Sequence, residues 1–326
     1  MIYLNDRHIQ EIGVDWNNLI DQIESTVRLM QTEEISQPLK PYLRFLHPGN
    51  RIIAMPAFVG GAVEASGVKW IASFPGNKTQ GLPRAHCTVI LNDPHSGVPV
   101  AFFQSGWLNT LRTAAVSGVM LRKYIEAHCD INSEKPIQLG IIGWGPIGWR
   151  HLEMVSEVFG DRLRSVRLFD SKGIDPSTID ANLLGITHIA ASWQEVYLSS
   201  NVFITCTAST DRYIDLLPAP GTLLLNISLR DYMPQIVQAV KAVIVDDWRE
   251  VCRENTDIEQ LHLKCGLQEG GVQTLKQVVC DNVLRKFTVD EPIFFNPMGM
   301  AAFDITLAAH YWRQAERLGI GVTLEE

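Results

Sequence analysis

Apolar residues recur at helical spacing in the first part of the chain, at Trp16, Leu19, Ile23 and Val27. This pattern predicts an amphipathic helix over residues 15–34. Two prolines, in the stretch 37–41, end the helical pattern. Strand-like runs separated by glycine and proline turns follow, and few helices lie between them. They predict a mainly antiparallel sheet. The runs are residues 51–59, 68–74, 87–93 and 99–105.

The pattern changes after an alanine-rich stretch, Leu108–His128, which predicts a long helix. Strand-like Ile137–Ile142 is followed by a glycine turn and by a helical pattern over Pro146–Phe159. Strands alternating with helices are typical of a parallel, doubly wound sheet. Further strand-like segments are residues 165–170, 187–190, 201–206, 221–228 and 242–248. We expect mostly helix over 252–290, a loop over 294–299 and a last helix over 300–319.

The fold class predicted is therefore α/β: a Rossmann doubly wound parallel sheet plus an α+β domain with a mainly antiparallel sheet. A length of 326 residues fits two such domains. Apolar residues make up 46% of the chain, enough for a large core.

Charge and cysteine usage narrow the class of partner. The net charge of −8 argues against nucleic acid. No apolar run reaches the length of a membrane span, and the N-terminus does not have the pattern of a signal peptide. The six cysteines are dispersed without a CxxC pair, which indicates reduced thiols rather than disulfides or a metal site. We expect a cytoplasmic protein with no nucleic-acid or membrane partner.

One segment of this acidic chain is cationic. The segment between Ser36 and Arg112 contains seven basic residues and only two acidic ones, Glu64 and Asp93. Such a segment suits a substrate with several carboxylates, and it equally suits a solvated face balanced by acids elsewhere. The basic residues are Lys40, Arg44, Arg51, Lys69, Lys78, Arg84 and Arg112.

The glycine turn has the spacing of a dinucleotide-binding motif. Gly143 permits the tight turn, Gly145 lets the backbone approach a pyrophosphate, and Gly148 lets the helix pack on the strand. The phosphates then meet free N–H groups at the helix start, where Pro146 is tolerated and Ile147 completes the motif. The alternative is an ordinary strand–turn–helix with incidental glycines.

Asp170 strengthens the dinucleotide interpretation. It ends the second strand, about 20 residues beyond the last glycine, where an acid binds the adenosine ribose. Its charge would repel a 2′-phosphate, so NAD is favoured over NADP. Lys172 nearby reduces this preference, because its positive charge would attract a 2′-phosphate.

Four motifs together resemble the ornithine cyclodeaminase/mu-crystallin family: Arg44 in KPYLR, Met55-Pro56, Gly67-Val68-Lys69, and Arg112 opening RTAA. QPLKPYLR, ILNDP, VDDW and NPMGMA are similar to the branch that makes 2,3-diaminopropionate for siderophore biosynthesis. GxGxxG replaces the GxGxQ common in cyclodeaminases, and residues 296–299 lack their Lys-Ser type sequence. Both departures disfavour ornithine as the substrate.

The resemblance implies a domain arrangement and a reaction. Residues 1–112 plus 297–326 would form a substrate-binding and dimerisation domain, and 113–296 the NAD-binding Rossmann domain. Members are homodimers whose sheets join across the interface. The related branch oxidises N-(2-amino-2-carboxyethyl)-L-glutamate with NAD⁺ and hydrolyses the imine to L-2,3-diaminopropionate and 2-oxoglutarate.

The resemblance also assigns substrate-binding roles. Arg44 and Arg112 would bind carboxylates through bidentate pairs. Lys40 and Arg84 are candidates for the remaining carboxylate, and Met55 would line the same site.

Two residues are candidates for catalysis. Lys69 would have its pKa lowered by burial near arginines and would take the amine proton or activate water, or else it is a surface lysine. Asp231, in a loop after a strand, would be the acid/base partner of the substrate nitrogen, or else a helix N-cap.

The remaining assignments concern the cofactor. Cys206, Thr207 and Ala208 follow a strand and would line the nicotinamide ribose. Asn226 and Ser228 are further candidates for this role. Asn296, Met298 and Gly299 would close over the nicotinamide from the other domain. Asp246 and Asp247 are expected to be exposed loop acids, with substrate contact as the alternative.

Other functions stay open within this resemblance. Ornithine cyclodeaminase, alanine dehydrogenase and ketimine reductase are enzymatic alternatives. A mu-crystallin-like protein that binds a dinucleotide or another ligand is the alternative from a different class. The combination of Lys69, Arg44, Arg112 and Asp231 favours chemistry.

Overall fold

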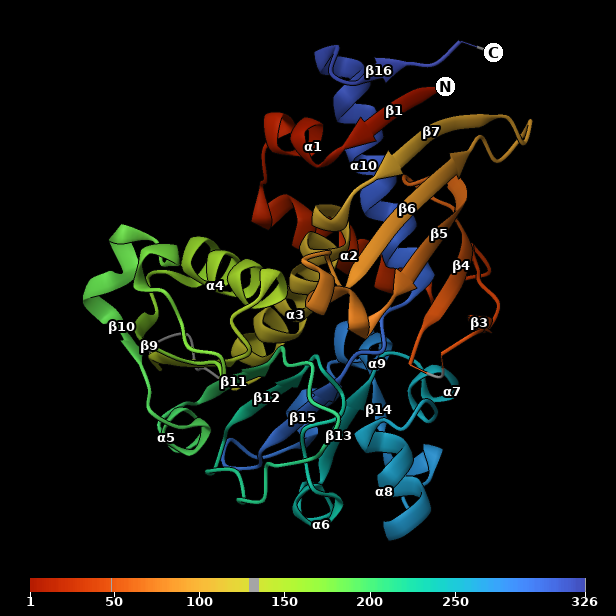
Figure 1. The fold of residues 1–326 in the computed structure, drawn as a ribbon. Coiled ribbons are helices and arrows are strands. Elements are labelled where there is room, and N and C mark those ends of the chain that lie inside the picture. The colour runs from red at the N-terminus through yellow and green to blue at the C-terminus, as the bar shows by residue number, and fades with distance from the viewer. Residues whose placement is uncertain (48, 129–134, 326) are drawn as a thin grey trace. The chain divides into compact units, whose positions relative to one another are not determined.

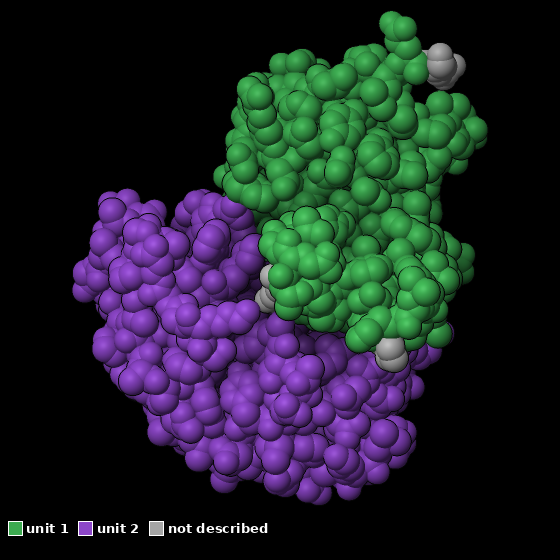
Figure 2. All heavy atoms as spheres, in the orientation of Figure 1, with its two compact units in different colours: residues 1–115, 299–326 green, residues 116–298 purple. Residues whose placement is uncertain are grey.

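The computed structural model describes residues 1–47, 49–128 and 135–325, so Cys129 lies outside it. The chain forms two compact units, coloured separately in Figure 2. Unit 1 comprises residues 1–115 and 299–326, and unit 2 comprises residues 116–298. These limits lie close to the boundaries predicted at residues 112 and 297.

Unit 1 is built on a sheet in the order β16-β1-β7-β6-β5-β4-β2, with β3 also paired to β4. Among the described residues its pairings are antiparallel except for the parallel pair β1–β7. The prediction of a mainly antiparallel sheet is confirmed. The strands are β1 (Ile2–Asn5), β2 (Ile35–Ser36), β3 (Tyr42–Arg44), β4 (Arg51–Val59), β5 (Ala65–Ser73), β6 (Ala85–Asn92), β7 (Pro99–Gln104) and β16 (Val322–Thr323).

One face of this sheet is covered by α10 (Ala301–Leu318), which contacts β4, β5 and β6 and crosses them in Figure 1. Helix α2 (Trp16–Leu29) packs on α10 and buries its predicted apolar stripe. It ends five residues before the predicted end, at the Met30 C-cap. Helix α1 (Asp6–Ile12) was not predicted, and Asn5 starts it through a capping box with His8.

In β4, β5, β6 and β7 the covered face of the sheet carries odd-numbered residues and the other face even-numbered ones, as the pleat requires. Met55, Val89 and Phe103 point to the covered face and are buried. Lys69 also lies on this face, directly across from Met55. The sheet therefore places a buried ammonium group among apolar side chains.

Unit 2 holds a wholly parallel sheet, in the order β10-β9-β8-β11-β12-β15-β13-β14. The predicted doubly wound Rossmann sheet is confirmed. The strand order reverses between β8 and β11, where open parallel sheets bind ligands. The strands are β8 (Ile137–Ile142), β9 (Leu163–Phe169), β10 (Thr187–Ile189), β11 (Val202–Thr205), β12 (Leu223–Asn226), β13 (Ala242–Val245), β14 (Gln273–Thr274) and β15 (Ile293–Asn296).

The prediction of a loop over residues 294–299 is wrong at its start. Strand β15 covers Ile293–Asn296 and inserts between β12 and β13. Its four residues are buried, as a strand covered on both faces requires. Pro292 and Pro297 flank it on either side.

The helices of unit 2 are mostly short. The long helix α3 (Gly106–His128) begins in unit 1 and ends in unit 2. It starts two residues before the predicted helix and ends at the predicted residue. The segment expected to be mostly helical, 252–290, contains two helices, 3₁₀ turns and also β14. The helices are α4 (Pro146–Phe159), α5 (Trp193–Leu198), α6 (Pro234–Val237), α7 (Trp248–Val251), α8 (Asp257–Cys265) and α9 (Leu275–Cys280).

No helix within the described ranges combines the length and the apolar character needed to cross a membrane.

Candidate active site

The glycine turn joins β8 to α4 at the reversal of strand order. Gly143 has a φ of +93°, which strongly favours glycine, and its N–H donates to the Phe169 carbonyl at 2.9 Å. A Cβ at Gly143 would lie 2.5 Å from the Cys206 carbonyl oxygen. The absent side chain therefore lets the ends of β8 and β11 approach each other.

Gly148 and Gly145 lack a side chain for different reasons. A Cβ at Gly148 would lie 2.4 Å from the Gly143 carbonyl oxygen, so this glycine is needed for packing. Among the described residues, no heavy atom beyond its chain neighbours lies within 4 Å of a Cβ placed on Gly145. Gly145 is the N-cap of α4, where unpaired N–H groups attract phosphate. Among the described residues, protein packing therefore does not require glycine at this position, and the backbone is open to the approach of a phosphate.

Asp170 follows β9 and is tied to the same turn. One carboxylate oxygen accepts from the Trp144 N–H at 2.8 Å, and the other from the Lys172 N–H at 2.9 Å. The carboxylate is thus fixed beside the first residues of the motif, in the position of a ribose-binding acid.

His151 supports α4 from within the core of unit 2. It is fully buried, and its ring nitrogens contact the Ser117 hydroxyl and the Ile147 carbonyl, each at 2.8 Å. Burial lowers the pKa of His151 to about 4, so the ring is neutral near pH 7. The Cys206 sulfur lies 3.9 Å from Nδ1. These contacts tie the predicted cofactor residues Ile147 and Cys206 together.

Asp231 is fully buried in the loop after β12. Its carboxylate accepts hydrogen bonds from the hydroxyls of Thr207 and Ser228, two predicted cofactor residues. The N-cap of α6 is Met233, without a side-chain hydrogen bond, so the alternative that Asp231 caps this helix is wrong. The structure thus brings Thr207, Ser228 and Asp231 together, while neighbouring Ala208 is exposed.

Asn226, another predicted cofactor residue, lies close to this group and is bound by protein partners. Its Nδ2 donates to Asp257 and to Asn296, and its Oδ1 accepts from Thr205 and from the Leu229 N–H. These four bonds use every donor and acceptor of the amide. Asn226 therefore holds strands β11, β12 and β15 together, and its amide has no further hydrogen bond to offer a cofactor.

The prediction that Asn296 belongs to the other domain is wrong. Asn296 is fully buried in β15, inside the sheet of unit 2, and does not reach over from another domain. The neighbouring Met298 N–H donates to Asp246 at 3.0 Å. Asp246 is buried and also accepts from the Asp247 N–H, so it is not the exposed loop acid expected. Asp247 caps α7.

Unit 1 contains a buried cluster of charges. The Lys69 ammonium donates to Asp304 at 2.9 Å and to Asn109 at 2.6 Å. The Arg112 guanidinium donates to the same Asp304 oxygen through Nε at 3.0 Å and to Asn109 through Nη2 at 3.1 Å. The side chains of Lys69 and Asp304 are each 2% exposed. The predicted surface-lysine alternative for Lys69 is therefore wrong.

Asp304 was missed by the sequence interpretation, which placed Lys69 among cations alone. Burial favours a raised pKa for Asp304, but Arg112 and Lys69 outweigh it and hold its pKa below the usual value. Its second oxygen has no hydrogen-bond partner among the described residues. One signal was available, because Asp304 is the acid within the otherwise apolar run AAFDITLAA.

Lys40 and Gly299 interact with one another and with this cluster. The buried Lys40 ammonium donates to the Gly299 carbonyl at 2.7 Å. Gly299 has a φ of +84°, and a Cβ there would lie 2.6 Å from the Arg112 guanidinium. Gly299 belongs to unit 1 and packs on Arg112. This packing alone explains why the position is occupied by glycine. In unit 1, Lys40 thus binds a backbone carbonyl, and Gly299 leaves room for the Arg112 guanidinium.

The other predicted cations gather elsewhere on unit 1. Arg44 is exposed and lies 5.5 Å from the centre of the Tyr42 ring, with Arg51 at 5.7 Å from the same ring. Burial and the nearby Arg51 lower the pKa of Arg84. Arg44, Arg51 and Arg84 therefore form a second cationic group, which we call the arginine group.

Comparison with known proteins places the chain among dinucleotide-dependent relatives. The model of the ornithine cyclodeaminase/mu-crystallin family matches residues 4–317. N-((2S)-2-amino-2-carboxyethyl)-L-glutamate dehydrogenase of Staphylococcus aureus is 32% identical over 99% of this chain and 98% of that protein. A Δ¹-pyrroline-2-carboxylate reductase of Bacillus cereus is 25% identical over 96% of each chain.

Two solved structures share the fold. The Thermococcus litoralis Δ¹-pyrroline-2-carboxylate reductase, in complex with NADH and L-proline, has a TM-score of 0.85 and 22% identity over 99% of this chain and 100% of its own. An archaeal alanine dehydrogenase dimer with bound NAD has a TM-score of 0.83 and 21% identity over 100% and 99%. Both confirm the predicted α/β architecture.

Proposed function

The chain belongs to the ornithine cyclodeaminase/mu-crystallin family, and from this membership we propose that it is an NAD-dependent oxidoreductase acting on a carbon–nitrogen bond of an amino acid. The open space at Gly145 supports this proposal, because it suits a pyrophosphate at the start of α4. So does Asp170, whose carboxylate would take the adenosine ribose hydroxyls.

The proposed substrate is N-(2-amino-2-carboxyethyl)-L-glutamate. The observation that carries it is the 32% identity to the Staphylococcus aureus dehydrogenase over nearly the whole of both chains. The overall reaction consumes substrate, NAD⁺ and water and yields 2-oxoglutarate, L-2,3-diaminopropionate, NADH and a proton. The substrate has three carboxylates, which suits the cations of unit 1.

Residues of unit 2 would hold the cofactor. Gly143, Gly145 and Gly148 with the first turn of α4 take the pyrophosphate, and Cys206 and Thr207 line the nicotinamide ribose. When bound, NAD⁺ supplies a hydride acceptor for the carbon attached to the reacting nitrogen. The chain itself must bind the carboxylates and move the protons.

The cations of unit 1 bind the carboxylates in this proposal. Lys69 and Arg112 share one carboxylate, Asp304, so the cluster keeps a net charge of +1 that a substrate carboxylate would balance. Arg44 and Arg84 of the arginine group would bind the remaining carboxylates through bidentate pairs. Met55, across from Lys69, limits the space beside the ammonium.

Asp231 and Lys69 carry out the proton transfers in this proposal. Asp231 accepts the proton of the secondary amine as the carbon is oxidised, and the Thr207 and Ser228 hydroxyls hold its carboxylate in place. Lys69 and Asp304 form a hydrogen-bonded acid–base pair that can exchange one proton with the water that adds to the imine. That water cleaves the carbon–nitrogen bond and releases both products.

We also propose a homodimer formed through the uncovered face of the unit 1 sheet. This face carries even-numbered apolar residues, and the rows Ala54–Trp70 and Val68–Ile90–Phe102 run across its strands. Trp70 is 43% exposed, which is unusual for a large aromatic side chain within a sheet. A second copy of the same sheet would cover this face.

The test is incubation of the purified chain with NAD⁺ and N-(2-amino-2-carboxyethyl)-L-glutamate, with absorbance of NADH and product analysis. We expect NADH, 2-oxoglutarate and diaminopropionate in equal amounts. Proline and ammonia from ornithine without net NADH would indicate a cyclodeaminase instead. NADH consumption with a cyclic imine would indicate a reductase, and NAD binding without any turnover would indicate a binding protein.

A further inference from the structure

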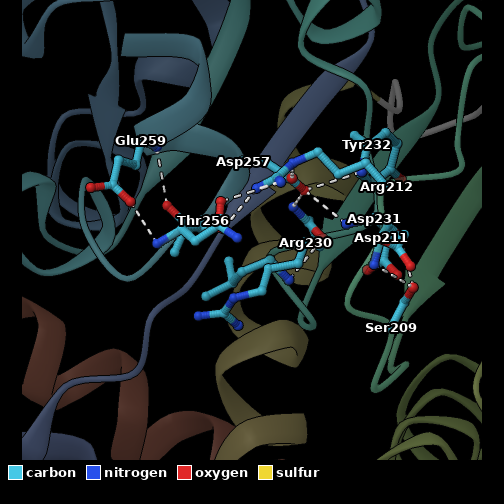
Figure 3. Close-up of polar contacts among 12 residues, drawn as sticks. Ser209, Asp211, Arg212, Arg230, Asp231, Tyr232, Thr256, Asp257 and Glu259 are labelled. Carbon is cyan, nitrogen blue, oxygen red and sulfur yellow. Dashed lines mark hydrogen bonds and ion pairs between the residues drawn. The ribbon is translucent and has the colours of Figure 1, made fainter. Parts of the chain in front are cut away.

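Asp257 is a buried carboxylate at the start of α8, 1% exposed, for which the sequence analysis predicts no role. Figure 3 shows it between Arg212 and the backbone of Asp231 and Tyr232. Oδ1 accepts from the Arg212 Nε at 2.6 Å. Oδ2 accepts from the Asp231 N–H at 3.1 Å, the Tyr232 N–H at 3.2 Å and the Asn226 amide at 2.9 Å. One side chain thus binds two consecutive peptide groups of the loop that carries Asp231.

The same loop is also held through its backbone. The Asp257 N–H donates to the Leu229 carbonyl at 2.7 Å, and the Leu229 N–H donates to Asn226. Leu229 has a φ of +64°, a conformation that is costly for a residue with a branched side chain. Such a conformation persists only where the surroundings impose it, and here Asp257 and Asn226 supply the contacts.

We propose that Asp257 is a positioning residue, which fixes the peptide groups of Asp231 and Tyr232 and thereby orients the Asp231 carboxylate for proton transfer. This inference rests on the proposed function, in which Asp231 accepts the substrate proton. Asp257 itself acts only through the loop. The glycine turn after β8 has no hydrogen bond to Asp257 among the described residues, so cofactor binding is expected to be independent of it.

The charges around Asp257 make the arrangement dependent on pH. Arg212 faces it from the segment after β11, Asp231 faces it from the loop after β12, and the hydroxyls of Tyr213 and Tyr232 add to its surroundings. Burial raises the pKa of Asp257 to about 6, and Arg212 offsets only part of that effect. Protonation would place a hydrogen on an oxygen that faces donors, so the loop loses acceptors as the pH falls through about 6.

As the pH rises, ionisation of Asp257 lowers the stability of the folded chain but raises its turnover. Because the pKa of Asp257 in the folded chain, about 6, exceeds its ordinary value of 3.8, the folded state binds this proton more tightly than the unfolded state. Its contribution to the free energy of unfolding therefore declines as the pH rises from about 4 to about 6. Over the same interval the ionised, positioning form becomes populated and turnover rises.

The experiment compares Asp257→Asn with the wild type over a pH series, with the glutamate conjugate or whichever compound of the panel above is turned over. We expect kcat at pH 8 to fall by roughly 100-fold, the effect of a misplacement of about 1 Å. The KM for NAD⁺ should change less than about twofold. The decline of wild-type kcat below pH 6 should disappear in the variant, because no group titrates at this position.

Glu259→Gln is the matched control. Glu259 lies in the same first turn of α8, and its carboxylate accepts from the Asn255 N–H. Among the described residues it makes no hydrogen bond to the loop around Asp231. This substitution removes a neighbouring negative charge from the same helix start. Both kcat and its decline near pH 6 should match the wild type.

Arg212→Met provides a second, independent variant if Asp257→Asn folds poorly. Loss of the guanidinium removes the charge that favours ionised Asp257, so the acid decline of kcat should move to higher pH. Hydrogen exchange of the peptide spanning residues 226–232, measured without substrate, should be faster in both variants, and exchange of the glycine turn should be unchanged.

Asp231→Asn separates this inference from the proposed function. If Asp231→Asn turns over at the wild-type rate, the proton-accepting role of Asp231 is wrong and the positioning role is overturned with it. If Asp231→Asn is inactive while Asp257→Asn keeps wild-type kcat, or keeps its decline near pH 6, only the positioning role is overturned. Unchanged hydrogen exchange of residues 226–232 in Asp257→Asn would overturn it as well, whether or not any substrate is turned over.

Discussion

Replacing Asp304 should destabilise the chain by removing the carboxylate that two buried cations share. Lys69 and Arg112 donate to the same Asp304 oxygen at 2.9 and 3.0 Å. Charge-assisted hydrogen bonds contribute about 1.5–3 kcal/mol each, and the loss of one partner from a buried ion pair costs about 3–5 kcal/mol. We therefore expect Asp304→Ala to lower the free energy of unfolding by about 3–5 kcal/mol. Asp304→Asn keeps an acceptor oxygen and should cost about half of that.

The assay is urea unfolding followed by tryptophan fluorescence, at pH 8 and at pH 3. Because the pKa of Asp304 is depressed in the folded chain, its stabilisation is complete above its ordinary value of 3.8 and is lost as the pH falls through the folded value. The difference between wild type and Asp304→Asn should therefore shrink at pH 3. Lys69→Met, combined with Asp304→Asn in a double-mutant cycle, should show a coupling energy above about 1 kcal/mol. A loss below about 0.5 kcal/mol for Asp304→Ala at pH 8 would show that the two cations do not depend on this carboxylate.

The remaining predictions concern the cofactor and assembly. Gly145→Ala should leave the melting temperature unchanged but weaken NAD⁺ binding at least tenfold in calorimetry, whereas Gly148→Ala should lower the melting temperature, because its Cβ meets a backbone oxygen. Equal melting temperatures would contradict this contrast. Asp170→Asn should reduce the preference for NAD⁺ over NADP⁺ by about tenfold in kcat/KM. Trp70→Glu should convert a dimer to monomer in light scattering, and an unchanged mass would refute the proposed interface.

The sequence predicted the strands and long helices because their apolar periodicity is regular. Residues 51–59, 137–142 and 146–159 were assigned with the bounds that the structure has. Strand β15 was missed because four consecutive buried residues between prolines have no periodicity to detect. Helix α1 was missed because a capping box and a single buried residue, Ile9, stabilise it, with no apolar stripe.

The candidate site was only partly predictable. The residue types suggested chemistry for Lys69, Arg112 and Asp231, and the structure places each of them in a buried polar cluster. Their partners Asp304 and Asp257 are distant in sequence, and nothing local pairs them. A carboxylate inside a helix or at a helix start has many ordinary roles, so only the tertiary structure shows what it contacts.

Nor could sequence distinguish a side chain that faces a ligand from one that holds the backbone. Lys40 and Asn226 have polar groups of the expected type, but protein groups occupy them. Such residues are satisfied by backbone or amide partners that lie far away along the chain. This limit is physical, because hydrogen-bonding capacity is a property of the residue and its use is a property of the fold.

Strand β5 sets Lys69 and Trp70 side by side in the chain but on opposite faces of the sheet. Under the proposed function, a substitution at Lys69 would act on the substrate site and a substitution at Trp70 on the proposed dimer face. An insertion or deletion of one residue in this strand would exchange the two faces, bringing the ammonium to the surface and the indole into the core. The length of β5 is therefore under a stricter constraint than the identity of its individual residues.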